Sequence, residues 1–208
     1  FKNYKKVSFF FLSVILISIL FFVVDLLFPI KTKLAYSTVV YSSDTTLIYA
    51  FLSQDDKWRM KILDKEISKE LEKTMLFKED KWFYYHFGVN PFSIIRALFS
   101  NAFYGKRTSG ASTITMQTAR LIEPKERTYF SKIKEMFRAI QLEVHYSKKE
   151  ILKIYMDKLP YGGNIEGVKA ASFIYLKKSP EKLSLAEIVA LSIIPNRPNS
   201  LTPGRNNE

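Results

Sequence analysis

The sequence predicts a mostly α-helical domain that carries a short β-rich segment and is tethered by one N-terminal transmembrane helix. Three observations predict this: a long uncharged apolar run near the N-terminus, two short β-rich runs after it, and helical periodicity with recognisable caps from Ile62 onward. We therefore expect four segments, which are a cytoplasmic tail at 1–6, a transmembrane anchor at 7–28, a β-rich linker at 29–60 and a globular domain at 61–208.

The anchor rests on Val7–Val24, an uncharged run of 18 residues. At ~1.5 Å per residue this helix is ~27 Å long, and the apolar residues up to Phe28 extend it across a ~30 Å hydrocarbon core. Asp25 lies near the outer end, where a carboxylate reaches the headgroups at low cost. The alternative is a cleaved signal peptide, but its apolar region would be unusually long and Leu34–Ser37 is a poor cleavage site. The sequence favours an uncleaved anchor.

The lysines around this span indicate its orientation. Lys2, Lys5 and Lys6 precede it, and Lys31 and Lys33 follow it. Because positive charge is enriched on the cytoplasmic side of membrane spans, this weak excess predicts a cytoplasmic N-terminus. The rest of the chain is then expected on the outer side of the membrane.

Local signals predict the secondary structure beyond the anchor. Ser37–Ser53 has two β-rich runs around a polar turn at Ser42–Thr46, and QDDKWRM follows as a polar connection. Helix starts are predicted from three caps, which are Asn90 before Pro91, the Ser147 and Glu150 capping box, and the Ser184 and Glu187 capping box. The second of these helices is expected to end at Gly162–Gly163 and the third at Pro195.

Composition excludes several classes of site. The 208 residues contain no cysteine, so disulfides, zinc–thiolate sites and thiol nucleophiles are excluded. His86 and His145 form no H-E-x-x-H pair, which excludes a zinc hydrolase of that type. The net charge of +12 suits an anionic partner, such as nucleic acid, an acidic membrane surface or a phosphorylated substrate. Charge alone does not choose among them.

The first candidate for chemistry is Glu79–Gly88. In a continuous helix Glu79, Phe83 and His86 would share one face. A carboxylate in this aromatic segment is expected to be partly desolvated, which would suit a general base. The alternative is a solvated turn at a helix end, and local composition by itself favours that interpretation.

The second candidate is Arg107–Arg120, a stretch rich in Gly, Ala, Ser and Thr. Small residues let backbone amides and hydroxyl groups approach a ligand closely, and Gln117 and Arg120 could point at one anionic group. The stretch lacks the spacing of a P-loop. Taken alone, it is better interpreted as a small-residue turn that leads into a helix.

The third candidate is the helix expected over Ser131–Tyr146. Its periodicity places Ile133, Phe137 and Ile140 on one apolar face, whereas Glu135 lies on the other side with Arg138, Ala139 and Leu142. That second side is mixed rather than fully polar. The alternative function for Glu135 is a surface ion pair with Arg138, worth a few tenths of a kcal/mol.

Five segments in order resemble the motifs of the peptidoglycan glycosyltransferase family, carbohydrate transferase family 51. The segments are EDKWFYYHFG, GASTITMQTAR, KIKEMFRAIQLE, KKEILKIYMDKLPYGGNIEGVKAAS and LSLAEIVALSIIPNRPNSLTP, which together cover Glu79 to Pro203. Finer details, namely the Met in TITMQ, YGGNIEGV and the WR of DDKWRM, resemble the 1C type of class A penicillin-binding protein. The resemblance implies a lysozyme-like helical fold for the domain at 61–208, which we expect to be truncated at its C-terminus.

The resemblance also implies roles for particular residues. Glu79 matches the catalytic base that deprotonates the 4-hydroxyl of the acceptor lipid II sugar, and Glu135 matches the second essential carboxylate, thought to organise the donor diphosphate directly or through a divalent metal such as Mg or Mn. The sequence itself requires no cofactor. The positions expected to bind substrate are Asp80, Phe83, His86, Gly88, Gly110, Ser112, Thr113, Gln117, Arg120, Lys132, Lys134 and Arg138.

The implied reaction is inverting transfer from a lipid-linked glycan with release of undecaprenyl diphosphate. The expected partners are lipid II, the growing lipid-linked glycan, the cytoplasmic (inner) membrane and cell-wall synthesis proteins. Four positions depart from the family pattern: Met116 and Leu121, which resemble type 1C usage, Asp157 in place of Asn, and Ser131 in place of Arg. The missing Arg is expected to weaken diphosphate binding.

Two other functions stay open at this stage. A lytic transglycosylase or lysozyme-like enzyme would share the helical fold, but it usually needs one acidic Glu and no cluster of basic residues. A non-catalytic, membrane-tethered binding module would use only the positive charge. A nucleic-acid binder is disfavoured because the basic residues are expected outside the cell and no nucleic-acid motif is present.

Overall fold

The computed structural model describes residues 2–43, 47–104, 112–126 and 128–203. The chain divides into two compact units, Phe1–Lys31 and Thr32–Glu208.

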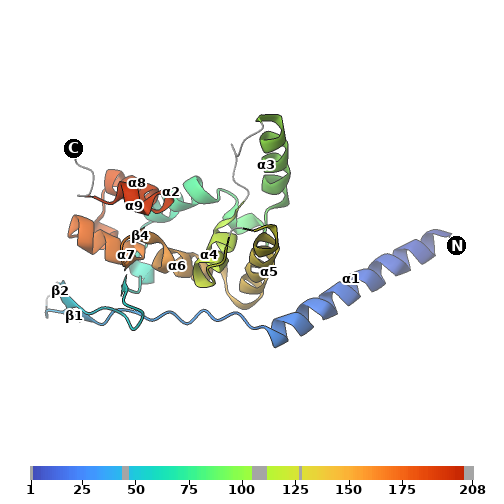
Figure 1. Ribbon diagram of the computed structural model, residues 1–208, viewed down its shortest axis with the longest axis horizontal. Helices are drawn as coiled ribbons and strands as arrows, with labels where there is room; N and C mark the ends of the chain where they lie inside the picture. Colours follow the sequence, from blue (N-terminus) through green and yellow to red (C-terminus); the bar gives the residue numbers. More distant parts are fainter. Residues whose placement is uncertain (1, 44–46, 105–111, 127, 204–208) are drawn as a thin grey trace. The chain divides into compact units, whose positions relative to one another are not determined.

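The first unit is a single helix, α1 (Lys2–Leu27), drawn in blue in Figure 1. Its segment Lys6–Leu27 has a mean hydropathy of 3.0 and is long and apolar enough to cross a membrane. The hydroxyls of Ser13 and Ser18 donate hydrogen bonds to the carbonyls of Phe9 and Val14, at 2.8 and 2.9 Å. These bonds satisfy the two polar side chains within the helix itself, as a hydrocarbon environment requires.

The second unit begins with the predicted β-rich pair. Strands β1 (Val39–Tyr41) and β2 (Leu47–Ala50) confirm the two predicted β-rich runs, and they pair antiparallel. Residues 44–46 of the predicted turn between them lie outside the described residues. Ala50 of β2 is buried in a small apolar cluster with Met60 and Ala170.

A second sheet contradicts the prediction that QDDKWRM is only a polar connection. Strand β3 (Trp58–Arg59) pairs in parallel with β5 (Ile165–Glu166), and β5 pairs antiparallel with β4 (Pro160–Gly162). A two-residue strand has no periodicity that a sequence pattern could reveal. Strand β3 forms because its partner, more than 100 residues further along the chain, supplies the hydrogen bonds.

The predicted helix starts are confirmed. Asn90 Oδ1 accepts a hydrogen bond from Ser93 N at 3.1 Å in the first turn of α3, and both capping boxes are formed, at Ser147 and Ser184. The helices of this unit are α2 (Lys69–Glu79), α3 (Pro91–Tyr104), α4 (Ile114–Ile122), α5 (Tyr129–His145), α6 (Lys148–Lys158), α7 (Val168–Ala171), α8 (Leu185–Ile193) and α9 (Pro198–Leu201). The short 3-10 turns are η1 (Asp64–Glu66), η2 (Phe83–Tyr85), η4 (Pro180–Lys182) and η5 (Ile194–Asn196), and η3 (Ser172–Leu176) is a π-helical turn.

One predicted helix end is wrong. Helix α6 ends at Lys158, before the predicted Gly162–Gly163. These two glycines instead have positive φ angles of 107° and 54° and turn the chain from β4 into β5. Because glycine has no Cβ, it adopts this backbone conformation without a steric penalty. At the third helix, α8 ends at Ile193 and η5, which contains Pro195, follows it.

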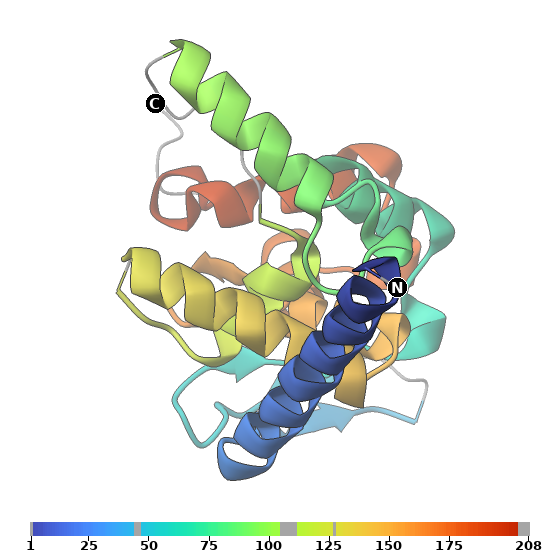
Figure 2. The same ribbon diagram turned by 90° about the vertical axis from the view of Figure 1, so that its right-hand side faces the viewer.

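The helices of the second unit pack in two groups. Helix α4 lies against α5 and α6, and α2 lies against α8, as Figures 1 and 2 show. In both views α3 projects away from the other helices of this unit. The core between them is formed by fully buried side chains, which include Leu71, Met75, Ile114, Leu142 and Ile151.

Helix α5 is buried most completely on the side that carries Glu135, whereas Phe137 and Ile140 of the predicted apolar face are only partly buried. Ile133, on the predicted apolar face, is 64% exposed, whereas Ala139 and Leu142 are completely buried. The sequence showed two partly apolar sides, and the contact of α5 with α4 decides between them. The side that carries Glu135 therefore faces the interior.

Candidate active site

Glu79 is the last residue of α2, and its segment is not one continuous helix. Asp80 is the C-cap, and η2 (Phe83–Tyr85) follows. Glu79, Phe83 and His86 therefore do not share one helix face, because the continuous helix that this would require is absent from the segment. Helix α2 ends here because the Asp80 carboxylate accepts hydrogen bonds from Ile114 N (3.0 Å) and His86 Nε2 (2.9 Å), which are tertiary contacts.

The Glu79 carboxylate is partly desolvated and is held at both oxygens. Its side chain is 16% exposed. Oε2 accepts a hydrogen bond from Gln117 Nε2 at 3.0 Å, and Oε1 accepts one from Lys78 Nζ at 2.5 Å. The aromatic residues of its own segment do not supply this environment, since Phe77 and Trp82 are mostly exposed. The contacts come from α4 and from the neighbouring lysine.

Two buried tyrosines, Tyr155 and Tyr161, lie near this carboxylate. Tyr155 Oη is 3.5 Å from Gln117 Oε1, so the Gln117 amide accepts from Tyr155 while it donates to Glu79. Burial, followed by the charge of Glu79, raises the pKa of both Tyr155 and Tyr161. Among the buried side-chain atoms that the structure describes, Tyr161 Oη and His86 Nδ1 have no hydrogen-bond partner.

Several residues expected to bind substrate make internal contacts around the start of α4. Thr113 is the N-cap of α4: its Oγ1 accepts from Met116 N at 3.1 Å and donates to the carbonyl of Gly88 at 2.5 Å. Gly88 has a φ of 76°, and a Cβ there would lie 2.9 Å from Ala139 O, so only glycine fits. Phe83 is buried in the core. With Asp80 and His86, these residues fix the position of α4 relative to Glu79.

Glu135 forms a second cluster with basic residues. Its side chain is 10% exposed, and its Oε1 lies 2.6 Å from Lys132 Nζ. Its Oε2 lies 3.7 Å from Arg120 Nη1. Lys132 Nζ also donates to Ser112 Oγ at 2.6 Å. This cluster therefore joins α5 to α4 and to the residue next to the Thr113 cap.

Two predicted residues, Lys134 and Arg138, make their described contacts outside both clusters. Lys134 lies over the ring of Phe130, 4.4 Å from its centroid. Arg138 pairs with Glu123 at 3.0 Å and donates to Gln141 Oε1 at 2.7 Å, rather than pairing with Glu135 as the alternative interpretation held. Gly110 lies outside the described residues.

Helix α4 links the two clusters. Gln117 holds Glu79, and Arg120, one helical turn further along the same face, approaches Glu135. The arrangement places a held carboxylate next to a group of cations. Chemically, this suits a base that takes a proton at one end and cations that stabilise a departing anion at the other.

Sequence reasoning did not single out Lys78, Tyr155 or Tyr161, although the tyrosines lie within the fourth motif-like segment. The only signal for Lys78 is its position next to Glu79. In the sequence the two tyrosines resemble ordinary core residues of α6 and β4. Only the fold places them near the Glu79 carboxylate.

The residues around Glu135 do not by themselves fit a metal ion. The groups closest to its carboxylate are two cations, which oppose the binding of a third. Across the described residues, no group of three His, Asp or Glu side chains could hold a metal. We therefore derive no chemical step through a metal.

A separate cavity of about 710 Å³ lies beside the start of α3. Its lining includes neither Glu79 nor Glu135, although His86 borders it. It is lined by Trp82, Tyr85, His86, Phe87, Val89, Asn90, Pro91, Phe92, Ser93 and Arg96. The two clusters are thus defined by their contacts and not by this cavity.

Comparison with known proteins identifies the class. The transglycosylase family model matches residues 44–208, so the chain belongs to the transglycosylase family. The chain is 42% identical to penicillin-binding protein 1C of Escherichia coli over 80% of its length and 38% identical to penicillin-binding protein 1A of that organism over 79%. It is also 32% identical to penicillin-binding protein 4 of Bacillus subtilis over 82%.

These relatives are much longer proteins. The matched region covers 22%, 19% and 27% of the three, so the chain spans about a fifth to a quarter of their length. The family membership confirms the resemblance that the five motif-like segments indicated.

Proposed function

We propose that this protein is a peptidoglycan glycosyltransferase that polymerises lipid II into glycan strands. Membership of the transglycosylase family supports glycosyl transfer to or from peptidoglycan glycans. The observation that carries the proposal is that α4 joins the held carboxylate of Glu79 to the basic cluster at Glu135, through Gln117 and Arg120.

Glu79 acts as the general base. It takes the proton from the 4-hydroxyl of the acceptor sugar while that oxygen forms a bond to the anomeric carbon of the lipid-linked donor. The bond from this carbon to the diphosphate oxygen breaks on the opposite face, so the configuration inverts and undecaprenyl diphosphate leaves. Gln117 keeps the carboxylate in one orientation, which favours transfer because the reacting atoms must be aligned.

The basic cluster stabilises the leaving group. The diphosphate gains negative charge as the bond to the sugar breaks, so positioned cations bind it more strongly in the transition state than before. Lys132 and Arg120 supply these cations. The largely buried Glu135 holds both of them through ion pairs, and Ser112 holds Lys132 in addition.

Helix α1 anchors the enzyme in the inner membrane with the N-terminus in the cytoplasm and the second unit outside. Its length and hydropathy support a membrane span. A span of this kind concentrates the domain where a lipid-tailed substrate is found.

Glu79→Gln tests the function. In the detergent-solubilised protein with lipid II, we expect polymer formation to fall by about 10²- to 10⁴-fold, because the amide cannot accept the proton. Lipid II binding is expected to persist, since the amide has nearly the same shape. The matched control is Glu70→Gln, a change of the same chemistry at an exposed position of α2, which should leave the rate unaltered.

Two results would contradict this function. Release of fragments from polymeric peptidoglycan, with no polymer made from lipid II, would indicate a lytic enzyme. Full function in Glu79→Gln would indicate a non-catalytic binding module.

A further inference from the structure

Lys78 makes contacts that neither the proposed mechanism nor its own helix requires. Adjacent residues of a helix point in different directions, so a lysine does not ordinarily bind the carboxylate that follows it. Lys78 Nζ nevertheless lies 2.5 Å from Glu79 Oε1. This is possible because Glu79 is the last residue of α2 and because α8 supplies further contacts to the same ammonium group.

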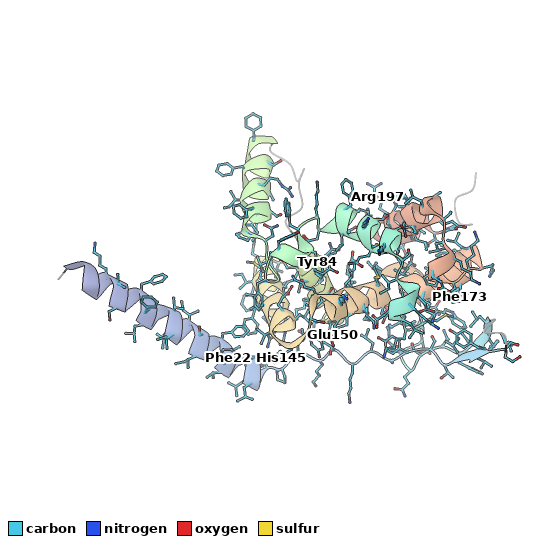
Figure 3. All side chains as sticks on the ribbon, turned by 180° about the vertical axis from the view of Figure 1, so that it is seen from behind. Phe22, Tyr84, His145, Glu150, Phe173 and Arg197 are labelled. Carbon is cyan, nitrogen blue, oxygen red and sulfur yellow. The ribbon has the colours of Figure 1, made fainter. Side chains whose placement is uncertain are left out.

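The partners of Lys78 on the α8 side are at the end of that helix. Nζ donates to the carbonyl of Ser192 and to Asn196 Oδ1, which is 3.3 Å away. Ser192 is in the last turn of α8 and Asn196 ends η5 (Figure 3 labels Arg197, which follows it). Carbonyl groups in the last turn of a helix lack intrahelical partners and attract cations.

The ammonium group of Lys78 has as many hydrogen-bond acceptors around it as it has N–H donors. An ammonium group has three N–H donors and no acceptor. Lys78 has three acceptors, which are Ser192 O, Asn196 Oδ1 and Glu79 Oε1. All three donors can therefore be used at once, and this fixes the ammonium group in space.

From these contacts we propose that Lys78 is a positioning residue that fastens the Glu79 carboxylate to the C-terminal end of α8. Gln117 holds Oε2 from α4, and Lys78 holds Oε1 from the α8 side. With both oxygens held, the carboxylate loses the rotational freedom that a side chain at a helix end otherwise has. This inference rests on the proposed role of Glu79 as the general base.

Lys78→Met is the direct test, since methionine keeps much of the apolar stem and removes the donors. In lipid II polymerisation by the membrane-anchored protein, we expect kcat to fall by about 10- to 100-fold with KM changed less than about threefold, because a misplaced base slows the chemical step. Lys78→Arg should recover part of the loss. Lys73→Met, on an exposed position of the same helix, is the matched control and should retain the full rate.

A second variant keeps the test valid if Lys78→Met folds poorly. Asn196 is exposed, so Asn196→Ala should fold normally, and loss of one of the three acceptors should lower kcat by about threefold. Thermal unfolding of each variant reports on folding separately.

The outcomes separate this inference from the proposed function. A Lys78→Met protein that unfolds at a lower temperature but keeps its kcat would show that Lys78 only caps α8, and a rise in KM alone would show that it binds substrate; either result overturns the inference. If Glu79→Gln is inactive in the same assays, the proposed function still holds. If Glu79→Gln is fully active, both the proposed function and the inference about Lys78 fail.

Discussion

Asp157 is a buried acid at a position where the resembled family usually has Asn. It is 2% exposed, and its carboxylate accepts hydrogen bonds from Tyr36 Oη at 2.8 Å and from Ile62 N at 2.9 Å. Burial raises the pKa of Asp157 from 3.8 to about 6, and the two hydrogen bonds only partly oppose this effect. The folded protein therefore holds this proton more tightly than the unfolded chain does.

This shift has a definite sign for stability. Because the folded pKa is the higher one, the charged carboxylate costs stability above pH 6, and this cost disappears as the pH falls from about 6 to about 4. Asp157→Asn should therefore raise the free energy of unfolding by about 1–3 kcal/mol at pH 8, with no gain near pH 4. Thermal unfolding in detergent at the two pH values, followed by Trp fluorescence, measures this. A gain that is equal at both values would contradict the burial argument.

At the scale of an element, α5 presents two different sides. Lys132 and Glu135 face α4, whereas Ile133 and Lys134 lie on the exposed side with Phe130. The resemblance assigned both lysines to substrate binding. The structure distinguishes them, because Lys132 alone of the two contacts Glu135 and Ser112 among the described residues.

A pair of variants on this one helix tests the distinction. Lys132→Met should lower the rate of lipid II polymerisation by at least about tenfold, because it removes a cation from the leaving group. Lys134→Met removes the same charge and should change the rate by less than about twofold, since exposed charges are strongly screened. Initial rates with both proteins at equal concentration give the comparison. Equal losses would mean that the net charge of α5, and not its geometry, determines the rate.

At the scale of the whole molecule, long-range contacts tie the β-rich segment to the helical part of the second unit. Arg59 of β3 is 1% exposed and donates to the carbonyl of Ala35 at 2.5 Å, while it pairs with Asp55 and Glu166 at 2.8 and 2.6 Å. A buried guanidinium is stable only when its donors are paired, so these three partners must come together as the unit folds. The β-rich segment and the later part of this unit that carries Glu166 are thus not independent.

The orientation in the membrane can be tested because the chain contains no cysteine. We expect a single cysteine at Lys73→Cys to react with a membrane-impermeant maleimide applied to the outer face of the inner membrane, because α2 lies in the second unit. Asn3→Cys should react only after the membrane is permeabilised. The opposite pattern would show that the proposed topology is wrong and that the second unit lies on the other side of the membrane from a substrate displayed outside.

Features that depend on neighbouring residues could be predicted from the amino-acid sequence. The structure confirms the apolar run that became α1, the two β-rich runs that became β1 and β2, and the caps at Asn90, Ser147 and Ser184. Each of these signals lies within one continuous stretch of the chain. The order of the five motif-like segments also identified the family.

Folding of the second unit sets the geometry of the site. It ended α2 at Glu79 through the bonds of Asp80 to Ile114 and His86, it chose which side of α5 is buried, and it brought Lys78 to the end of α8. Each of these outcomes depends on a partner from another part of the chain. A local pattern cannot reveal such a partner, because the free energy of the contact exists only once the chain has folded.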